Sequence, residues 1–152
     1  EWTKRASFMF PVVHSIEASQ EYYDKATKRF KDVKRITLHL GDSKDVLPRL
    51  CKSICEPVFF YLDAHWCLNE ENSPVYTGNK IPLWDELQAI KERPYADIIA
   101  IDDAFIFGKK FTEDFDWTGI TKDTLDAFLG DRIEPSRVFW DHYVALSKDK
   151  TS

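Results

Sequence analysis

The sequence predicts an α/β fold with an open, mostly parallel sheet, helices on both faces and a C-terminal antiparallel hairpin. Short runs rich in Val, Ile and Phe alternate with helical stretches, as expected for parallel strands that are buried on both faces. Acidic residues recur where these runs end, at Glu17, Asp42, Asp63 and the pair Asp102-Asp103. Because ligands bind outside the carboxyl ends of parallel strands, these acids predict a site for a ribose, a metal ion or both.

The first half of the chain is predicted to alternate helices and strands. The expected order is helix 1–10, strand 12–16, helix 19–30, strand 36–40 and helix 43–54. Pro11 ends the first helix because proline cannot continue one. Ser19 and Ser43 are expected to cap the two helices that follow, since a serine hydroxyl accepts a hydrogen bond from an unpaired amide of the first turn.

The second half continues the alternation and closes with a hairpin. The expected order is strand 58–62, loop 69–80, helix 82–93, strand 98–101, loop 104–119, helix 121–130 and strands 138–140 and 143–146. Pro82 suits the first turn of its helix, and Thr121 and Gly130 suit the two ends of the last one. Asp141 and His142 separate the last two strands, which are expected to form an antiparallel edge.

The composition of the chain favours a single globular domain and argues against some kinds of binding partner. A chain of 152 residues with 43% hydrophobic and 31% charged residues is typical of one globular domain. A net charge of −5 without a basic cluster argues against nucleic-acid binding. No apolar run approaches the roughly 20 residues that span a bilayer. Three cysteines favour a reducing, cytoplasmic location over a disulfide framework. We expect a small-molecule substrate and leave open whether the chain forms a homo-oligomer.

Four motifs carry a resemblance to a known family. They are HSIEAS (14–19), LHLGDSKDVLPRL (38–50), FFYLDAHW (59–66) and IIAIDDAF (98–105). In this order and spacing the chain resembles the class I S-adenosylmethionine-dependent methyltransferases, which have a Rossmann-like fold. Within that family it is most similar to metal-dependent O-methyltransferases of the catechol and macrocin types. The resemblance implies methyl transfer from S-adenosylmethionine to a hydroxyl of a small polyhydroxylated metabolite, assisted by Mg²⁺.

The resemblance also implies where the cofactor binds. Glu17, followed by Ala18, matches the acidic residue that holds both ribose hydroxyls, because one carboxylate can accept two hydrogen bonds from a diol. Gly41, Asp42 and Ser43 match the turn that contacts adenine, although Asp42 and Ser43 also suit a helix cap. Trp66 resembles an aromatic residue beside the adenine, and core packing is an equally good interpretation. Asp63 matches a residue near the methionine part of the cofactor.

The metal ligands and the base are implied in the same way. Asp63, Asp102 and Asp103 match the three ligands of the catechol-type enzymes, and carboxylate oxygens suit Mg²⁺. The ion would hold two substrate oxygens and lower the pKa of one hydroxyl. His65, two residues after Asp63, is the candidate base, since its ordinary pKa lies near neutrality. His142 is predicted to be structural.

Three alternatives stay open. One alternative is a zinc site formed by Cys51, Cys55, Cys67 and His65. The preferred interpretation is that the cysteines are small hydrophobic residues buried in the core. The IDDA segment also resembles the acidic metal motif of nucleotide-sugar glycosyltransferases. A non-catalytic, degenerate cofactor-fold domain is the third alternative, because no glycine-rich loop like the one that holds the methionine part in the family precedes Glu1.

The missing loop leads to a prediction about the sheet. In the family, strand one lies between strands two and four, which correspond here to 12–16 and 58–62. We therefore expect that the N-terminus is truncated and that these two strands are not hydrogen-bonded to each other. Direct pairing of the two strands would show a differently ordered sheet.

Overall fold

The computed structural model describes residues 2–63, 81–113 and 115–151. The described residues form an α/β fold with five α-helices, namely α1 (Trp2–Met9), α2 (Gln20–Phe30), α3 (Ser43–Ser53), α4 (Leu83–Lys91) and α5 (Lys122–Leu129). The strands are β1 (Val13–Glu17), β2 (Ile36–Leu40), β3 (Phe59–Leu62), β4 (Ile98–Ile101), β5 (Lys110–Thr112), β6 (Phe115–Asp116), β7 (Arg137–Phe139) and β8 (His142–Leu146). None of the helices in these ranges has the length and apolar character that crossing a membrane requires.

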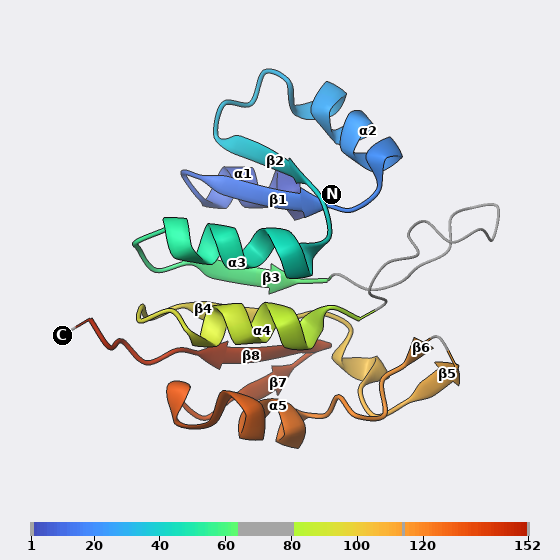
Figure 1. The fold of residues 1–152 in the computed structure, drawn as a ribbon, viewed down its shortest axis with the longest axis vertical. Coiled ribbons are helices and arrows are strands. Elements are labelled where there is room, and N and C mark those ends of the chain that lie inside the picture. Colours follow the sequence, from blue (N-terminus) through green and yellow to red (C-terminus); the bar gives the residue numbers. More distant parts are fainter. Residues whose placement is uncertain (1, 64–80, 114, 152) are drawn as a thin grey trace.

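The strands pair in three separate sheets. β1 and β2 form a parallel pair, and β3, β4, β8 and β7 form a mixed sheet in that order. β3 and β4 are parallel, whereas β8 runs antiparallel to both β4 and β7. β5 and β6 form a small antiparallel pair. The predicted single, mostly parallel sheet is therefore seen in part, and the predicted C-terminal hairpin is confirmed. In Figure 1, β1, β2 and β3 point in the same direction, with α3 and α4 in front of the strands and α1 behind β1.

The prediction that the strands at 12–16 and 58–62 do not pair is confirmed. Among the described strands, β1 pairs with β2 alone and β3 with β4 alone. Two side chains of helix α1 contact these strands, one on each strand. The hydroxyls of Thr3 and Ser15 on β1 lie 3.0 Å apart, and the rings of Trp2 and Tyr61 on β3 have centroids 4.4 Å apart. Side chains of one helix thus connect two strands whose backbones are not joined.

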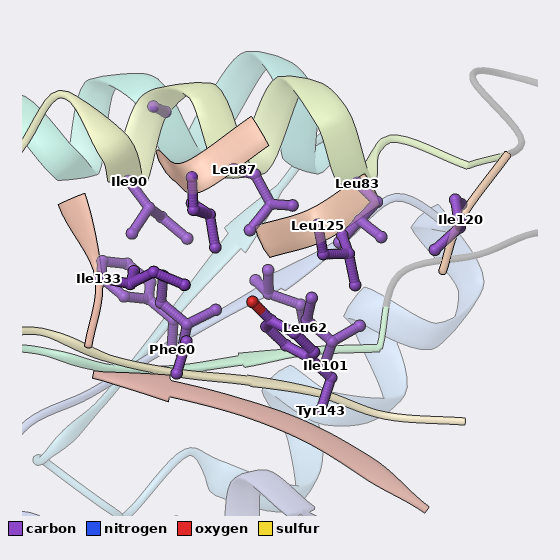
Figure 2. Packing of buried hydrophobic residues seen from close by; sticks show 14 of the residues in the cluster. Phe60, Leu62, Leu83, Leu87, Ile90, Ile101, Ile120, Leu125, Ile133 and Tyr143 are labelled. Atoms are coloured by element: carbon purple, nitrogen blue, oxygen red, sulfur yellow. The ribbon is translucent and has the colours of Figure 1, made fainter. Parts of the chain in front are cut away.

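The hydrophobic core lies between the mixed sheet and the helices α4 and α5. Its strand residues include Phe60, Leu62, Ile101 and Tyr143, and its helix residues include Leu83, Leu87, Ile90, Leu125 and Leu129. In Figure 2 the labelled strand residues Phe60, Leu62, Ile101 and Tyr143 meet the labelled helix residues Leu83, Leu87, Ile90 and Leu125. The helix residues follow the i, i+3, i+4 spacing that places apolar groups on one face. By contrast, α2 buries no residue.

The N-terminal caps of α2 and α5 lie at the predicted residues, and the cap of α3 lies one residue before the predicted one. The hydroxyl of Ser19 accepts a hydrogen bond from the amide of Tyr22, and Thr121 forms a capping box with Thr124, as expected. In α3 the cap is Asp42, whose side chain accepts from the amide of Lys44, and Ser43 is the first helical residue. The prediction that Ser43 caps this helix was therefore wrong by one position.

The long loop predicted at 104–119 contains regular structure that the sequence did not indicate. It holds a 3-10 turn (Ala104–Ile106) and the pair β5–β6. Strands of two or three residues are too short for a recognisable alternation of apolar and polar residues. The predicted loop at 69–80 lies outside the described residues.

Candidate functional site

The carboxyl ends of β1 and β2 bring the predicted cofactor residues together. Glu17 is the last residue of β1 and lies opposite Leu40, the last residue of β2. The amide of Gly41 donates a 3.0 Å hydrogen bond to the carbonyl of Glu17. Glu17 and Asp42 therefore lie at the same edge of this strand pair, because the two strands are parallel and in register.

Each acid of this turn is held by a backbone amide. The carboxylate of Glu17 accepts a 2.9 Å hydrogen bond from the amide of Ser19, which bends the chain through the half-buried Ala18 into α2. The carboxylate of Asp42 accepts a 3.1 Å hydrogen bond from the amide of Lys44 and is almost fully buried. Asp42 therefore caps α3, which is one of the two roles that the sequence left open, and cofactor binding by either acid stays a prediction.

Gly41 is required at this turn by its conformation and by its surroundings. Its φ of 147° lies in a region that L side chains rarely adopt, and an added Cβ would lie 2.9 Å from Cγ2 of Val46. We expect Gly41→Ala to lower the free energy of unfolding by about 1–3 kcal/mol. Gly119→Ala is the matched control, because a Cβ there meets no atom within 4 Å. Equal urea midpoints for the two variants would contradict this prediction.

The ends of β3 and β4 carry the predicted metal ligands. Asp63 and Asp102 line the same small cavity of about 10 Å³, which is room for one water molecule. The hydroxyl of Tyr61 donates to Oδ2 of Asp102. The pKa of Tyr61 is raised strongly, first by burial, then by this hydrogen bond and by the negative charges of Asp102, Asp63 and Asp103. The charges of all three predicted ligands thus raise the pKa of the Tyr61 hydroxyl, which keeps its proton near neutral pH.

Asp102 is also held from the other side by the C-terminal hairpin. Nε2 of His142 lies 3.1 Å from Oδ1 of Asp102, and Nδ1 of the same ring lies 3.4 Å from Oδ1 of Asp141. The amide of Asp103 donates a 2.9 Å hydrogen bond to Oδ1 of Asp102. His142, predicted to be structural, therefore lies at the predicted metal rim, between two carboxylates.

One group of potential metal ligands exists in residues 2–63, 81–113 and 115–151. It consists of Asp102, Asp141 and His142, whose ligand atoms all lie within 4.8 Å of one another. The group includes Asp102 of the predicted set but neither Asp63 nor Asp103, and it contains neither Cys51 nor Cys55 of the zinc hypothesis. The set Asp63, Asp102 and Asp103 stays a prediction. The candidate base His65, Trp66 and Cys67 lie outside the described residues.

Sequence analysis missed Glu86, which lines the same cavity as Asp63 and Asp102. Its side chain is 2% exposed, and its Oε2 has no hydrogen-bond partner within the described part of the chain. Burial raises the pKa of Glu86 to about 7; the nearby Ser43 hydroxyl lowers it, and the charges of Asp42 and Asp85 raise it. The helical spacing did contain a signal, since position 86 falls on the apolar face formed by Leu83, Leu87 and Ile90.

Comparison with known proteins adds no family assignment. The chain matches no model of a known protein family and no curated protein.

Proposed function

We propose that this protein transfers a methyl group from S-adenosylmethionine to a hydroxyl of a small polyhydroxylated metabolite. The observation that carries this proposal is the arrangement of the strands. β2 and β1 form one pair, β3 and β4 begin another sheet, and β1 and β3 are not joined. The order matches the family that the motifs resemble, in which one further strand separates these two. We also propose that the domain is cytoplasmic and Rossmann-like.

The residues at the ends of β1 and β2 would hold the adenosine part of the cofactor. Glu17 would accept hydrogen bonds from the ribose hydroxyls while its Oε1 stays oriented by the amide of Ser19. Gly41 would form the turn that leads into this region, and Asp42 with Ser43 would face the adenine edge. The bound cofactor would supply an electrophilic methyl group on its sulfonium.

The carboxylates at the ends of β3 and β4 would orient the acceptor. Tyr61 and His142 hold Asp102 in place, which fixes the direction of its carboxylate. Mg²⁺ at Asp63, Asp102 and Asp103 is the expectation from the resemblance. The donor atoms that converge in the described residues belong instead to Asp102, Asp141 and His142, and one of them is an imidazole nitrogen. This donor set does not fit the preference of Mg²⁺ for oxygen, so we derive no step through a magnesium ion.

Titration calorimetry with S-adenosylmethionine tests the proposal. We expect saturable binding that Glu17→Ala weakens about tenfold or more, since charge-assisted hydrogen bonds to the ribose are lost. Glu21→Ala is the matched control, because Glu21 is exposed on α2 and forms an ion pair with Lys25. Equal affinities of the two variants for S-adenosylmethionine would show that Glu17 does not bind the cofactor.

The same titration separates the alternatives. A nucleotide sugar, added with and without Mg²⁺, should give no binding heat if the methyltransferase proposal is right. Binding of the nucleotide sugar alone would favour a glycosyltransferase. Failure of both ligands to bind would overturn the proposal in favour of a non-catalytic domain.

A further inference from the structure

We propose that Asp102, Asp141 and His142 form a binding site for a divalent transition-metal ion such as Mn²⁺ or Zn²⁺. The site lies at the rim used in the proposed function, but its existence does not depend on methyl transfer. It replaces Asp63 and Asp103 of the expected magnesium set with an exposed carboxylate and an imidazole from the C-terminal hairpin.

The sheet brings these residues together from segments about forty positions apart. β4 and β8 are antiparallel, and Ile101 lies opposite Tyr143. The paired residues end there, and Asp102 follows β4 directly while His142 is the first residue of β8, so the two side chains meet at this end of the ladder, with Nε2 of His142 3.1 Å from Oδ1 of Asp102. Asp141 lies in the turn just before His142, and its carbonyl accepts a 2.6 Å hydrogen bond from the amide of Ala104. The turn is therefore tied to the end of β4.

The distances between the donor atoms suit one ion. A metal bound at about 2.0–2.2 Å by each donor requires donor atoms roughly 3–4 Å apart. The pair His142 Nε2 and Asp102 Oδ1 lies at 3.1 Å, and the whole group fits within 4.8 Å. A rotation of the exposed Asp141 side chain toward the ion would close the remaining gap. The half-buried His142 and Asp102 would change little.

The chemistry of the donors selects the class of ion. Imidazole nitrogen suits Zn²⁺, Mn²⁺ and related transition metals, whereas Mg²⁺ prefers an all-oxygen set that keeps several waters. A metal-bound histidine usually donates its second ring N–H to a carboxylate. Oδ1 of Asp102 lies beside Nε2 of His142, and Oδ1 of Asp141 lies beside Nδ1, so one ring nitrogen would bind the ion together with the carboxylate next to it, and the other carboxylate would turn toward the ion to complete the site.

Asp102 already has the supporting contacts that a ligating carboxylate needs. The hydroxyl of Tyr61 donates to its Oδ2, and the amide of Asp103 donates to its Oδ1. Such contacts orient a ligand before the ion arrives. Without an ion, the same residues form a histidine shared by two carboxylates, and this ion-pair arrangement is the result that a test must distinguish from a metal site.

Mn²⁺ provides a direct probe. We expect Mn²⁺ to bind the protein with one equivalent of high-affinity sites and to show nitrogen coupling from a single imidazole in pulsed electron paramagnetic resonance. His142→Gln and Asp141→Asn should each weaken binding at least tenfold, and His142→Gln should remove the nitrogen coupling. Zn²⁺ should compete with Mn²⁺ far better than Mg²⁺ does. Circular dichroism verifies that each variant is folded.

A pair of imidazoles on β1 and β2 supplies the matched control. His14 Nδ1 and His39 Nε2 lie 3.0 Å apart on neighbouring strands and could bind a metal themselves. The double variant His14→Ala, His39→Ala should keep both the affinity and the nitrogen coupling. Loss of the coupling in this variant would place the ion at β1 and β2 and overturn the proposal.

The remaining outcomes separate this inference from the proposed function. Binding that Asp63→Asn and Asp103→Asn weaken, while His142→Gln does not, would overturn the inference and favour the magnesium set. Absence of Mn²⁺ and Zn²⁺ binding would identify the cluster as an ion pair and overturn it as well. Metal binding through His142 without S-adenosylmethionine binding would leave the inference standing and defeat the methyltransferase proposal.

Discussion

Replacing Arg93 with methionine is expected to lower the free energy of unfolding by about 3–5 kcal/mol. The reason is that the substitution would leave Asp97 buried without its cation. Both side chains are almost fully inaccessible, and they meet through two hydrogen bonds of 2.9 and 3.2 Å. Removing one partner of a buried ion pair leaves an uncompensated charge in a medium of low polarity.

Arg93 also supplies hydrogen bonds to the backbone at the end of α3. Its guanidinium donates to the carbonyls of Cys51, Ile54 and Glu56 at 2.7–2.8 Å. Asp97 in turn accepts a 2.9 Å hydrogen bond from the amide of Val58, just before β3. One buried pair therefore joins the end of α3, the start of β3 and the start of β4, and its loss would leave several of these groups unpaired.

Urea unfolding followed by circular dichroism measures this effect. Arg49→Met is the matched control, since Arg49 is exposed on α3 and its replacement should change stability by about 0.5 kcal/mol or less. The double variant Arg93→Met, Asp97→Asn should recover part of the loss, because the isolated charge is gone. Similar midpoints for Arg93→Met and Arg49→Met would show that the ion pair contributes little.

Elements with a local signal were predictable from the sequence. β2 and β4 have the predicted bounds, because Ile36, Leu38 and Leu40 alternate with polar residues in β2, and β4 is a continuous apolar run that ends at Asp102. Pro11 follows the first helix, and the caps at Ser19 and Thr121 begin α2 and α5 as expected. These features depend on neighbouring residues only, so no knowledge of the tertiary structure is needed to find them.

The candidate site was predictable only in part, because the contacts between its residues depend on how strands far apart in the sequence pair. The acids at strand ends could be found, since each follows an apolar run. The contact between Asp102 and His142 could not, because it follows from the antiparallel pairing of β4 with β8. A histidine at the start of a short strand has no local pattern that points to a partner forty residues away.

Glu86 is expected to make the protein less stable as pH rises through neutrality. Burial raises its pKa from 4.5 to about 7, so the folded state binds a proton more tightly than the unfolded chain does. The tighter proton binding adds its full stabilisation to the folded state below about pH 4.5. This stabilisation is lost as pH rises through about 7. The difference between the two pKa values corresponds to about 3 kcal/mol.

The variant Glu86→Gln isolates this effect, because it keeps the shape of the side chain and removes its titration. Its free energy of unfolding should match that of the wild type near pH 4 and exceed it by about 3 kcal/mol near pH 8. Glu21→Gln, at an exposed position of α2, should follow the wild type at every pH. A constant difference between wild type and Glu86→Gln across this range would mean that Glu86 does not titrate near neutrality. Its buried Oε2 would then be stabilised as a carboxylate by a group beyond the contacts described above.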